Sequence, residues 1–206
     1  MAVQAFHKEN KSEPNQELYR QWKGVFRSLP GFERCVCLRR VRCPNRRGDM
    51  DFFLINPAPG PKLGLVECEG FKGKAGKEKS IVPLGVEQLL NYLAGFLHYQ
   101  NRGKAIFEDS IQDAFNEKKL RGRTNREQWS SQKEFMRAVD CKTESDLIRL
   151  LDRASRELIP ILLYYRKTPL ATREEEVLSL AFAKHRLYAG AVRWPEADKL
   201  LGGRYL

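Results

Sequence analysis

Near the N-terminus the apolar residues recur every three or four positions, which is helical spacing. Five of them share one stripe: Leu18, Trp22, Val25, Phe26 and Leu29. This stripe predicts a helix from about residue 15 to residue 29, and Pro30-Gly31 supplies the stop signal. Residues 1–14 are polar and carry no such stripe, so we expect a disordered tail there.

Three short apolar runs follow, separated by turn residues. They are residues 35–41, residues 51–56 (DFFLIN) and residues 63–69 (LGLVECE). Because glycine and proline punctuate the gaps, this order predicts a three-stranded β-meander. A second helix is expected from Pro83, which suits a first helical turn, since apolar residues then recur at helical spacing as far as Leu97.

The second half of the chain contains several signals for the start of a helix. Ser131-x-x-Glu134 and Thr172-x-x-Glu175 match the capping-box pattern, and Thr143-x-x-Asp146 is a weaker match because aspartate replaces glutamate. Apolar residues at helical spacing follow the Thr143 motif. We therefore predict a helical insertion over about residues 104–158.

Pro160 is expected to end that insertion, and the apolar run ILLYY after it predicts a fourth strand at about residues 160–166. C-terminal helices are predicted over residues 172–200. These elements fit one α/β domain spanning residues 15–206, with its core in residues 15–100.

Composition narrows the cellular context. The hydrophobic fraction of 42% argues against wholesale disorder, and no run approaches the roughly 20 apolar residues that cross a bilayer. The polar N-terminus lacks a signal-peptide pattern, so we expect a cytoplasmic protein without membrane contact. Five cysteines, an odd number, then predict reduced thiols, and buried small side chains are favoured over a zinc site.

The formal net charge of +11 favours a polyanionic partner, although it also suits an anionic membrane or mere solubility. The charge is clustered. Arginines crowd residues 34–47, a second cluster comprises Lys72, Lys74, Lys77 and Lys79, and a third spans residues 118–126. We expect Arg46, Arg47 and the four lysines to bind phosphates, while the third cluster suits a solvated face equally well.

Three acids lie in the strand-like runs. Asp51 opens one run, and Glu67 and Glu69 close another, where alternation places both on the same face. Carboxylates that converge there would repel each other unless cations bind, and Mg²⁺ prefers such oxygen ligands. The alternative is that the strands lie at the sheet edge and the acids are solvated. Spacing alone does not decide between the two.

Short motifs in these segments resemble the signature of the PD-(D/E)xK nucleases. They are Gly48-Asp49-Met50-Asp51-Phe52-Phe53, Leu65-Val66-Glu67-Cys68-Glu69-Gly70 and Gln88-x-x-x-Tyr92. The first two are most similar to the nuclease-related domain of some helicase-associated and standalone bacterial proteins. The third resembles the helix motif of the recombination exonuclease branch. The likeness covers about residues 15–100.

The resemblance implies a PD-(D/E)xK-like core of helix, three-stranded β-meander, helix and fourth strand. It also implies a site for Mg²⁺ (or Mn²⁺) held by Asp51, Glu67 and Glu69. Gln88 would complete the catalytic set, and Tyr92 would orient the site or contact the nucleic-acid backbone. The implied substrate is nucleic acid, with DNA favoured, and a helicase is the kind of protein partner implied.

The chain departs from the family at Glu69, where the family carries a lysine. Three explanations stay open: two-metal chemistry with E-x-E, replacement of the lysine by Lys72 or Lys74, or a degenerate domain. The leading hypothesis is therefore a DNA nuclease, and the alternative is a noncatalytic nucleic-acid-binding or partner-binding module. A small-molecule phosphohydrolase is less favoured, because the chain carries no P-loop or other small-substrate motif.

Overall fold

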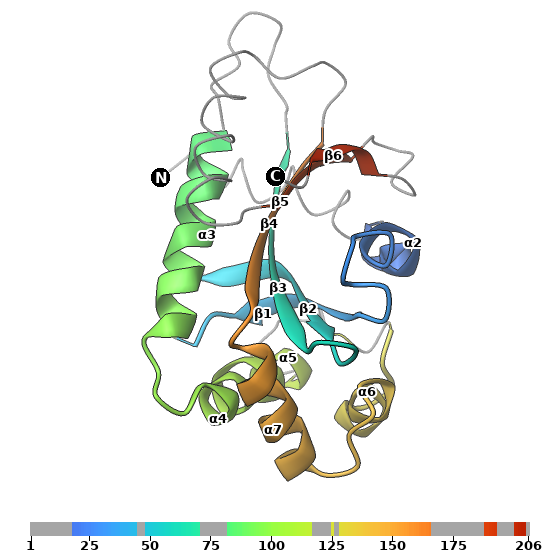
Figure 1. Ribbon diagram of the computed structural model, residues 1–206, viewed down its shortest axis with the longest axis vertical. Helices are drawn as coiled ribbons and strands as arrows, with labels where there is room; N and C mark the ends of the chain where they lie inside the picture. The colour runs from blue at the N-terminus through green and yellow to red at the C-terminus, as the bar shows by residue number, and fades with distance from the viewer. Residues whose placement is uncertain are drawn as a thin grey trace, which may run out of the picture.

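The computed structural model describes residues 18–44, 48–70, 82–116, 125, 128–165, 188–192 and 200–204. The described strands form one mixed six-stranded sheet in the order β1-β2-β3-β4-β5-β6 (Figure 1). Their bounds are Val36–Arg42 (β1), Asp49–Asn56 (β2), Lys62–Gly70 (β3), Leu158–Tyr165 (β4), Tyr188–Val192 (β5) and Leu200–Arg204 (β6).

Along the chain, α2 precedes β1, and the other described helices lie between β3 and β4. Their bounds are Trp22–Phe26 (α2), Val82–Leu97 (α3), Arg102–Ile106 (α4), Gln112–Phe115 (α5), Gln132–Ala138 (α6) and Glu144–Ala154 (α7), with a π-helical turn, Phe107–Ile111 (η1), between α4 and α5. Helix α3 lies along one side of the sheet and α2 on the other (Figure 1). No helix in the described ranges has both the length and the apolar character needed to cross a bilayer.

Strands β1, β2 and β3 form the predicted antiparallel meander. Strand β4 then pairs with β3 in parallel. Parallel neighbours need a long crossover connection, and the helices between β3 and β4 supply it. The sequence prediction of a mixed α/β fold with a fourth strand is thus confirmed. Pro160 lies inside β4 instead of ending a helix, before Ile161, where the pairing with β5 begins. Within the described residues, β4 has one neighbouring strand at that position, which is where proline is tolerated in a sheet.

The two faces of the sheet can be told apart by their aromatic contacts. Phe52 packs against Tyr19 and Phe26, with ring centroids 6.2 and 5.5 Å away, on the α2 side. Phe53, the next residue, stacks on Phe96 of α3 at 5.8 Å. Since side chains alternate along a strand, Asp51 shares the α3 face with Phe53.

The edge strand β1 is closed by residues from beyond α5. The buried side chain of Asn125 accepts hydrogen bonds from the Arg39 N–H and the Tyr19 hydroxyl and donates to the carbonyl oxygens of Arg39 and Ala114. Trp129 Nε1 donates to the Cys37 carbonyl oxygen at 3.0 Å. These side chains take the place of a neighbouring strand, which protects the edge from pairing with another chain.

Both predicted capping motifs in the described part begin a helix, but they differ in detail. Thr143 and Asp146 form a complete capping box at α7, although the sequence match was the weaker one. Ser131 accepts the Glu134 N–H at 3.2 Å, whereas the Glu134 carboxylate reaches Ser130. Aspartate, although shorter than glutamate, is therefore sufficient at the third helical position to complete a capping box.

The first helix ends earlier and is less regular than predicted. Residues 18–20 are helical, Gln21 interrupts, and α2 covers Trp22–Phe26. The prediction of helices over residues 172–200 is wrong at residues 188–192, which form β5, and Leu200 begins β6. The segment Tyr188–Val192 (YAGAV) has no clear periodicity, so pairing with the apolar strand β4 decides its conformation. The other residues of 172–199, the N-terminal tail and residues 15–17 lie outside the described ranges.

Candidate active site

The sheet forks where the two predicted catalytic strands meet. Strands β2 and β3 pair from Asn56↔Lys62 to Phe52↔Val66, and no further pair joins them in this described stretch. Beyond that point β2 remains paired with β1, and β3 remains paired with β4 as far as Gly70↔Tyr165. Asp51 and Glu67 are the first residues past the last pair, one on each branch of the fork.

A backbone hydrogen bond fixes Asp51 in this fork. Its Oδ2 accepts the N–H of Cys68 at 2.9 Å. This hydrogen bond lies just past Phe52↔Val66, the last β2–β3 residue pair, so the carboxylate links the two strands where their residue pairing has ended. Asp51 is therefore held at the branch point while its side chain stays half-buried.

Glu67 is the most deeply buried acid of the described residues, with 3% of its surface exposed. Its Oε2 lies 3.2 Å from the Tyr92 hydroxyl, which is also 3.1 Å from the carbonyl oxygen of Asp49. The hydroxyl has one hydrogen, so the two acceptors share it. A buried carboxylate has to be hydrogen-bonded, paired, protonated or metal-bound, because it has lost its hydration.

The carboxylates of Asp51 and Glu67 both act electrostatically on the Tyr92 hydroxyl. Burial raises the pKa of Tyr92 far above its ordinary value, and the negative charges of Glu67 and Asp51 raise it further. Tyr92 therefore keeps its proton at physiological pH and remains a donor to the two acceptors, Glu67 and the Asp49 carbonyl oxygen. Both acids belong to the same face of the sheet as α3, which carries Tyr92 and, one turn earlier, the half-buried Gln88.

One predicted role has to be corrected. Tyr92 was expected to contact the nucleic-acid backbone or to orient the site, but only 4% of its surface is exposed and its hydroxyl points into the fold. The burial and the two internal hydrogen bonds favour the orienting role over a backbone contact. Gly48, with φ of 155°, brings the backbone against the Tyr92 ring, and a Cβ there would lie 3.4 Å from Cε1.

Several predicted site residues cannot be placed. Glu69 is described only as part of the β3 backbone, and its side chain is not. Outside the described residues lie the predicted phosphate-binding side chains and the catalytic candidate Lys72: Arg46, Arg47, Lys72, Lys74, Lys77 and Lys79. Among the described side chains, no three of His, Cys, Asp or Glu gather as a metal-ligand group.

The described arginines of the first basic cluster are less available than their sequence suggests. Arg39 is 4% exposed and lies over the Tyr19 ring, 5.4 Å from its centroid. Arg34 lies 3.2 Å from Asp140, and Arg42 lies 3.6 Å from both Asp49 and Asp113. These contacts concern Arg34, Arg39 and Arg42 alone, and the expectation of phosphate binding by Arg46 and Arg47 falls outside the described residues.

The residues present suit a hard divalent cation. Asp51 and Glu67 supply carboxylate oxygens, which Mg²⁺ and Mn²⁺ prefer, and Mg²⁺ commonly binds through one or two carboxylates together with water and substrate phosphate. The described cysteines do not compete as ligands, since all five are buried free thiols. Their burial confirms the prediction of buried small side chains.

Two backbone groups at the site gave no signal in the sequence. The Cys68 N–H and the Asp49 carbonyl oxygen hold Asp51 and Tyr92 in place, and any residue type could supply them. Gly48 did give a signal, because glycine is the residue that adopts positive φ without strain.

Comparison of the chain with protein-family models, curated proteins and solved structures finds no significant match.

Proposed function

We propose that this protein is a metal-dependent nuclease that hydrolyses phosphodiester bonds of DNA. The observation that carries the proposal is the carboxylate pair at the fork, Asp51 and Glu67, with Glu67 buried and bonded to Tyr92. Placing two acids together at the end of a strand pair is unfavourable without a compensating charge. A bound cation would supply that charge and give the arrangement a purpose.

In this proposal Asp51 and Glu67 hold Mg²⁺ or Mn²⁺. A bound metal ion would supply Lewis-acid stabilisation of the phosphate and an activated water. Tyr92 keeps the Glu67 carboxylate in one orientation, and the Cys68 N–H does the same for Asp51. Such preorganisation matters because a ligand that must first reorient loses affinity and rate.

The remaining parts of the catalytic set are also proposals. Gln88 is half-buried one turn before Tyr92 on α3 and would contact the substrate or a bound water. Glu69 would be a third metal ligand, and Lys72 or Lys74 would supply the cation that the resembling family takes from its lysine. The net charge of +11 supports a polyanionic substrate.

The test is cleavage of supercoiled, linear and single-stranded DNA in Mg²⁺, Mn²⁺ or EDTA. We expect cleavage that needs the metal and is lost in both Asp51→Asn and Glu67→Gln. Replacing Lys72, Lys74, Lys77 and Lys79 by alanine should weaken DNA binding and flatten its dependence on salt, because fewer counterions are released. A protein that cuts none of these substrates in either metal would overturn the proposal.

A second candidate is a noncatalytic module that binds nucleic acid or a protein partner such as a helicase. One observation favours it: each carboxylate already accepts a hydrogen bond within the fold. In that case the acids would be structural. DNA binding without cleavage, together with an absence of metal binding, would assign this function.

A further inference from the structure

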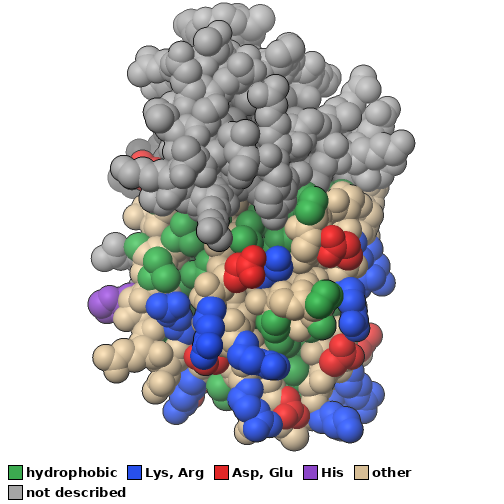
Figure 2. All heavy atoms as spheres, viewed as in Figure 1, with side chains coloured by type: hydrophobic (Ala, Val, Ile, Leu, Met, Phe, Trp, Pro, Cys, Tyr) green, Lys and Arg blue, Asp and Glu red, His purple; other side chains and the backbone are tan. Residues whose placement is uncertain are grey.

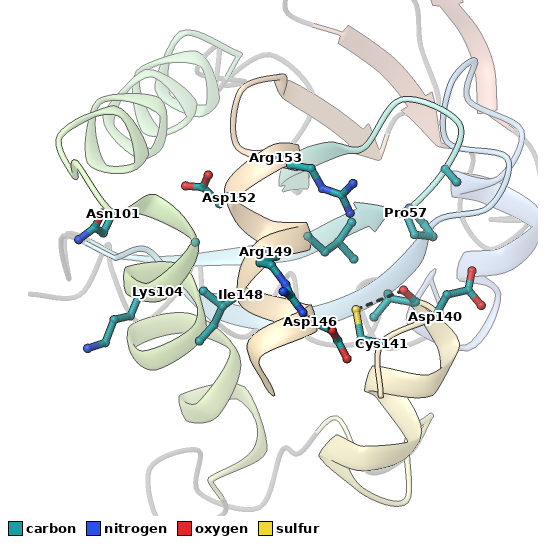
Figure 3. A pocket seen from close by; sticks show the side chains of 14 residues that line it. Pro57, Asn101, Lys104, Asp140, Cys141, Asp146, Ile148, Arg149, Asp152 and Arg153 are labelled. Carbon is teal, nitrogen blue, oxygen red and sulfur yellow. Dashed lines mark hydrogen bonds and ion pairs between the residues drawn. The ribbon is translucent and has the colours of Figure 1, made fainter. Parts of the chain in front are cut away.

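A hollow of about 840 Å³ lies away from the fork, at the other end of the β2–β3 ladder. It is bounded by Pro57 and Ala58 of the β2–β3 loop, the start of α4, the turn after α6, and α7 (Figure 3). Its volume falls within the range of small-molecule sites. None of the acids or polar residues of the candidate active site lines it.

Two arginines one helical turn apart stand on one side of this hollow. Figure 3 shows Arg149 and Arg153 on the side of α7 that faces Pro57 and Cys141. Arg149 Nη2 donates to Asp146 Oδ1 at 2.7 Å. No acid of the described residues lies within ion-pair distance of Arg153, which is exposed.

Three basic residues (Lys104, Arg149, Arg153) and three acids (Asp140, Asp146, Asp152) line the hollow, so the unequal distribution lies in how these residues are paired. Basic and acidic side chains are mixed over this face (Figure 2). Each acid of the lining has a cationic partner: Asp140 with Arg34 at 3.2 Å, Asp146 with Arg149 at 2.7 Å and Asp152 with Arg156 at 3.9 Å. Lys104 lies 3.6 Å from Glu108. Among the described residues, Arg153 is therefore the one cation of the lining that has no acid within ion-pair distance.

Part of the lining of the hollow is aliphatic. Val139 and Leu150 are buried, Ile148 is half-buried, and Pro57 and Ala58 close one side. None of the residues that line it is aromatic, so it offers no ring for stacking a nucleobase. A long polyanion is also a poor match, because Asp140 and Asp146 share this side with the arginines.

We propose that this hollow binds a small organic anion: one carboxylate or phosphate group on an aliphatic body. Arg153 would receive the anionic group, since guanidinium pairs with either through two parallel hydrogen bonds. Arg149 would add a second donor group from the same side. The aliphatic body would cover Val139 and Leu150. The site is separate from the fork and does not depend on the nuclease proposal.

The test is a titration with hexanoate and with hexyl phosphate, followed in amide NMR spectra of isotope-labelled protein. Hexanol serves as the uncharged control. We expect saturable shifts at Cys141, Ile148 and Leu150 with one or both anions, and the tighter anion identifies the natural head group. Arg153→Gln should weaken binding about tenfold or more, because a charge-assisted hydrogen bond is lost. Arg156→Gln, an exposed arginine on the same helix, should change it less than about twofold.

Three results would overturn the proposal. The first is that hexanol gives the same shifts as the anions, which would show that the surface binds apolar chains without recognising the charge. Arg153→Gln could bind as the wild type does, which would remove the recognition element. The third such result is that the shifts fail to saturate below roughly 20 mM with either anion, which would show that the protein has no specific site for them. Arg153 is exposed, so its variant should fold, and the spectrum itself reports this.

Discussion

Asp51 Oδ2 accepts the backbone N–H of Cys68 at 2.9 Å, at the point where β2 and β3 separate. The bond replaces a strand-to-strand pair with a side chain, and so ties the candidate metal ligand to the geometry of the sheet. The Asp51 carboxylate thereby acquires a structural role next to the chemical one that we propose.

These two roles of Asp51 can be separated by substitution. Asp51→Ala leaves the Cys68 N–H without its acceptor and should lower the free energy of unfolding by about 1–3 kcal/mol. Asp51→Asn keeps a carbonyl oxygen at that position and should lower it by less. Urea denaturation without divalent cations measures the difference. Equal stabilities of the two variants would show that the hydrogen bond contributes nothing.

Tyr92→Phe tests the buried hydroxyl. It removes the donor shared by Glu67 and the Asp49 carbonyl oxygen, and we expect a loss of about 1–2 kcal/mol. Because Tyr92 is buried, the dependence of DNA affinity on salt should not change. A flatter salt dependence, measured by fluorescence anisotropy, would return Tyr92 to the DNA interface.

Asn125 should be among the most sensitive positions of the chain. Its side chain makes four hydrogen bonds to three other residues and closes the β1 edge. Asn125→Ala should therefore cost about 2–4 kcal/mol, since several buried partners lose their bonds at once. Asn101→Ala, an exposed asparagine with no side-chain cap bond, is the control and should stay within about 0.5 kcal/mol. Similar thermal unfolding of both variants would refute the edge role.

The buried thiols predict a loss of stability at alkaline pH. Burial raises the pKa of Cys35 to about 12 from its ordinary 9.0. Between these values the unfolded chain releases the proton and the folded chain keeps it, so the free energy of unfolding falls as pH rises from about 9. Below about pH 9 the Cys35 thiol should make no contribution to the pH dependence of the free energy of unfolding. A Cys35→Ala variant, whose own stability differs, should show a shallower decline over the same window in denaturation curves. If the stability of the wild type and of Cys35→Ala declined in parallel with pH, Cys35 would not be the group responsible.

Much of the fold could be predicted from local pattern. The meander, α3, α7 and the fourth strand follow from residues close in sequence, and so do the helix starts at Ser131 and Thr143. Strand β5 could not be predicted, because pairing with β4 determines it and the segment itself has no strong preference.

The site was predictable by residue type and less so by geometry. Asp51 and Glu67 were identified from their positions in apolar runs, and the register places them at the fork. The burial of Tyr92 and Arg39 was not predictable, since it depends on how α3 and Tyr19 pack on the sheet. Charge clusters in sequence say nothing of ion pairs formed with distant residues, such as Arg34 with Asp140.

The most direct test of the account is Mn²⁺ binding, because the central claim is that Asp51 and Glu67 hold a divalent cation. Electron paramagnetic resonance reports the free ion during a titration. The account predicts that the wild type binds Mn²⁺, that Asp51→Asn and Glu67→Gln each weaken binding at least about tenfold, and that the exposed α3 acid variant Glu87→Gln binds normally. Both site variants should stay folded, and Glu67→Gln should be at least as stable as the wild type without metal, since a buried charge is removed. Wild-type protein that binds no Mn²⁺, or site variants that bind it as well as Glu87→Gln does, would contradict the account.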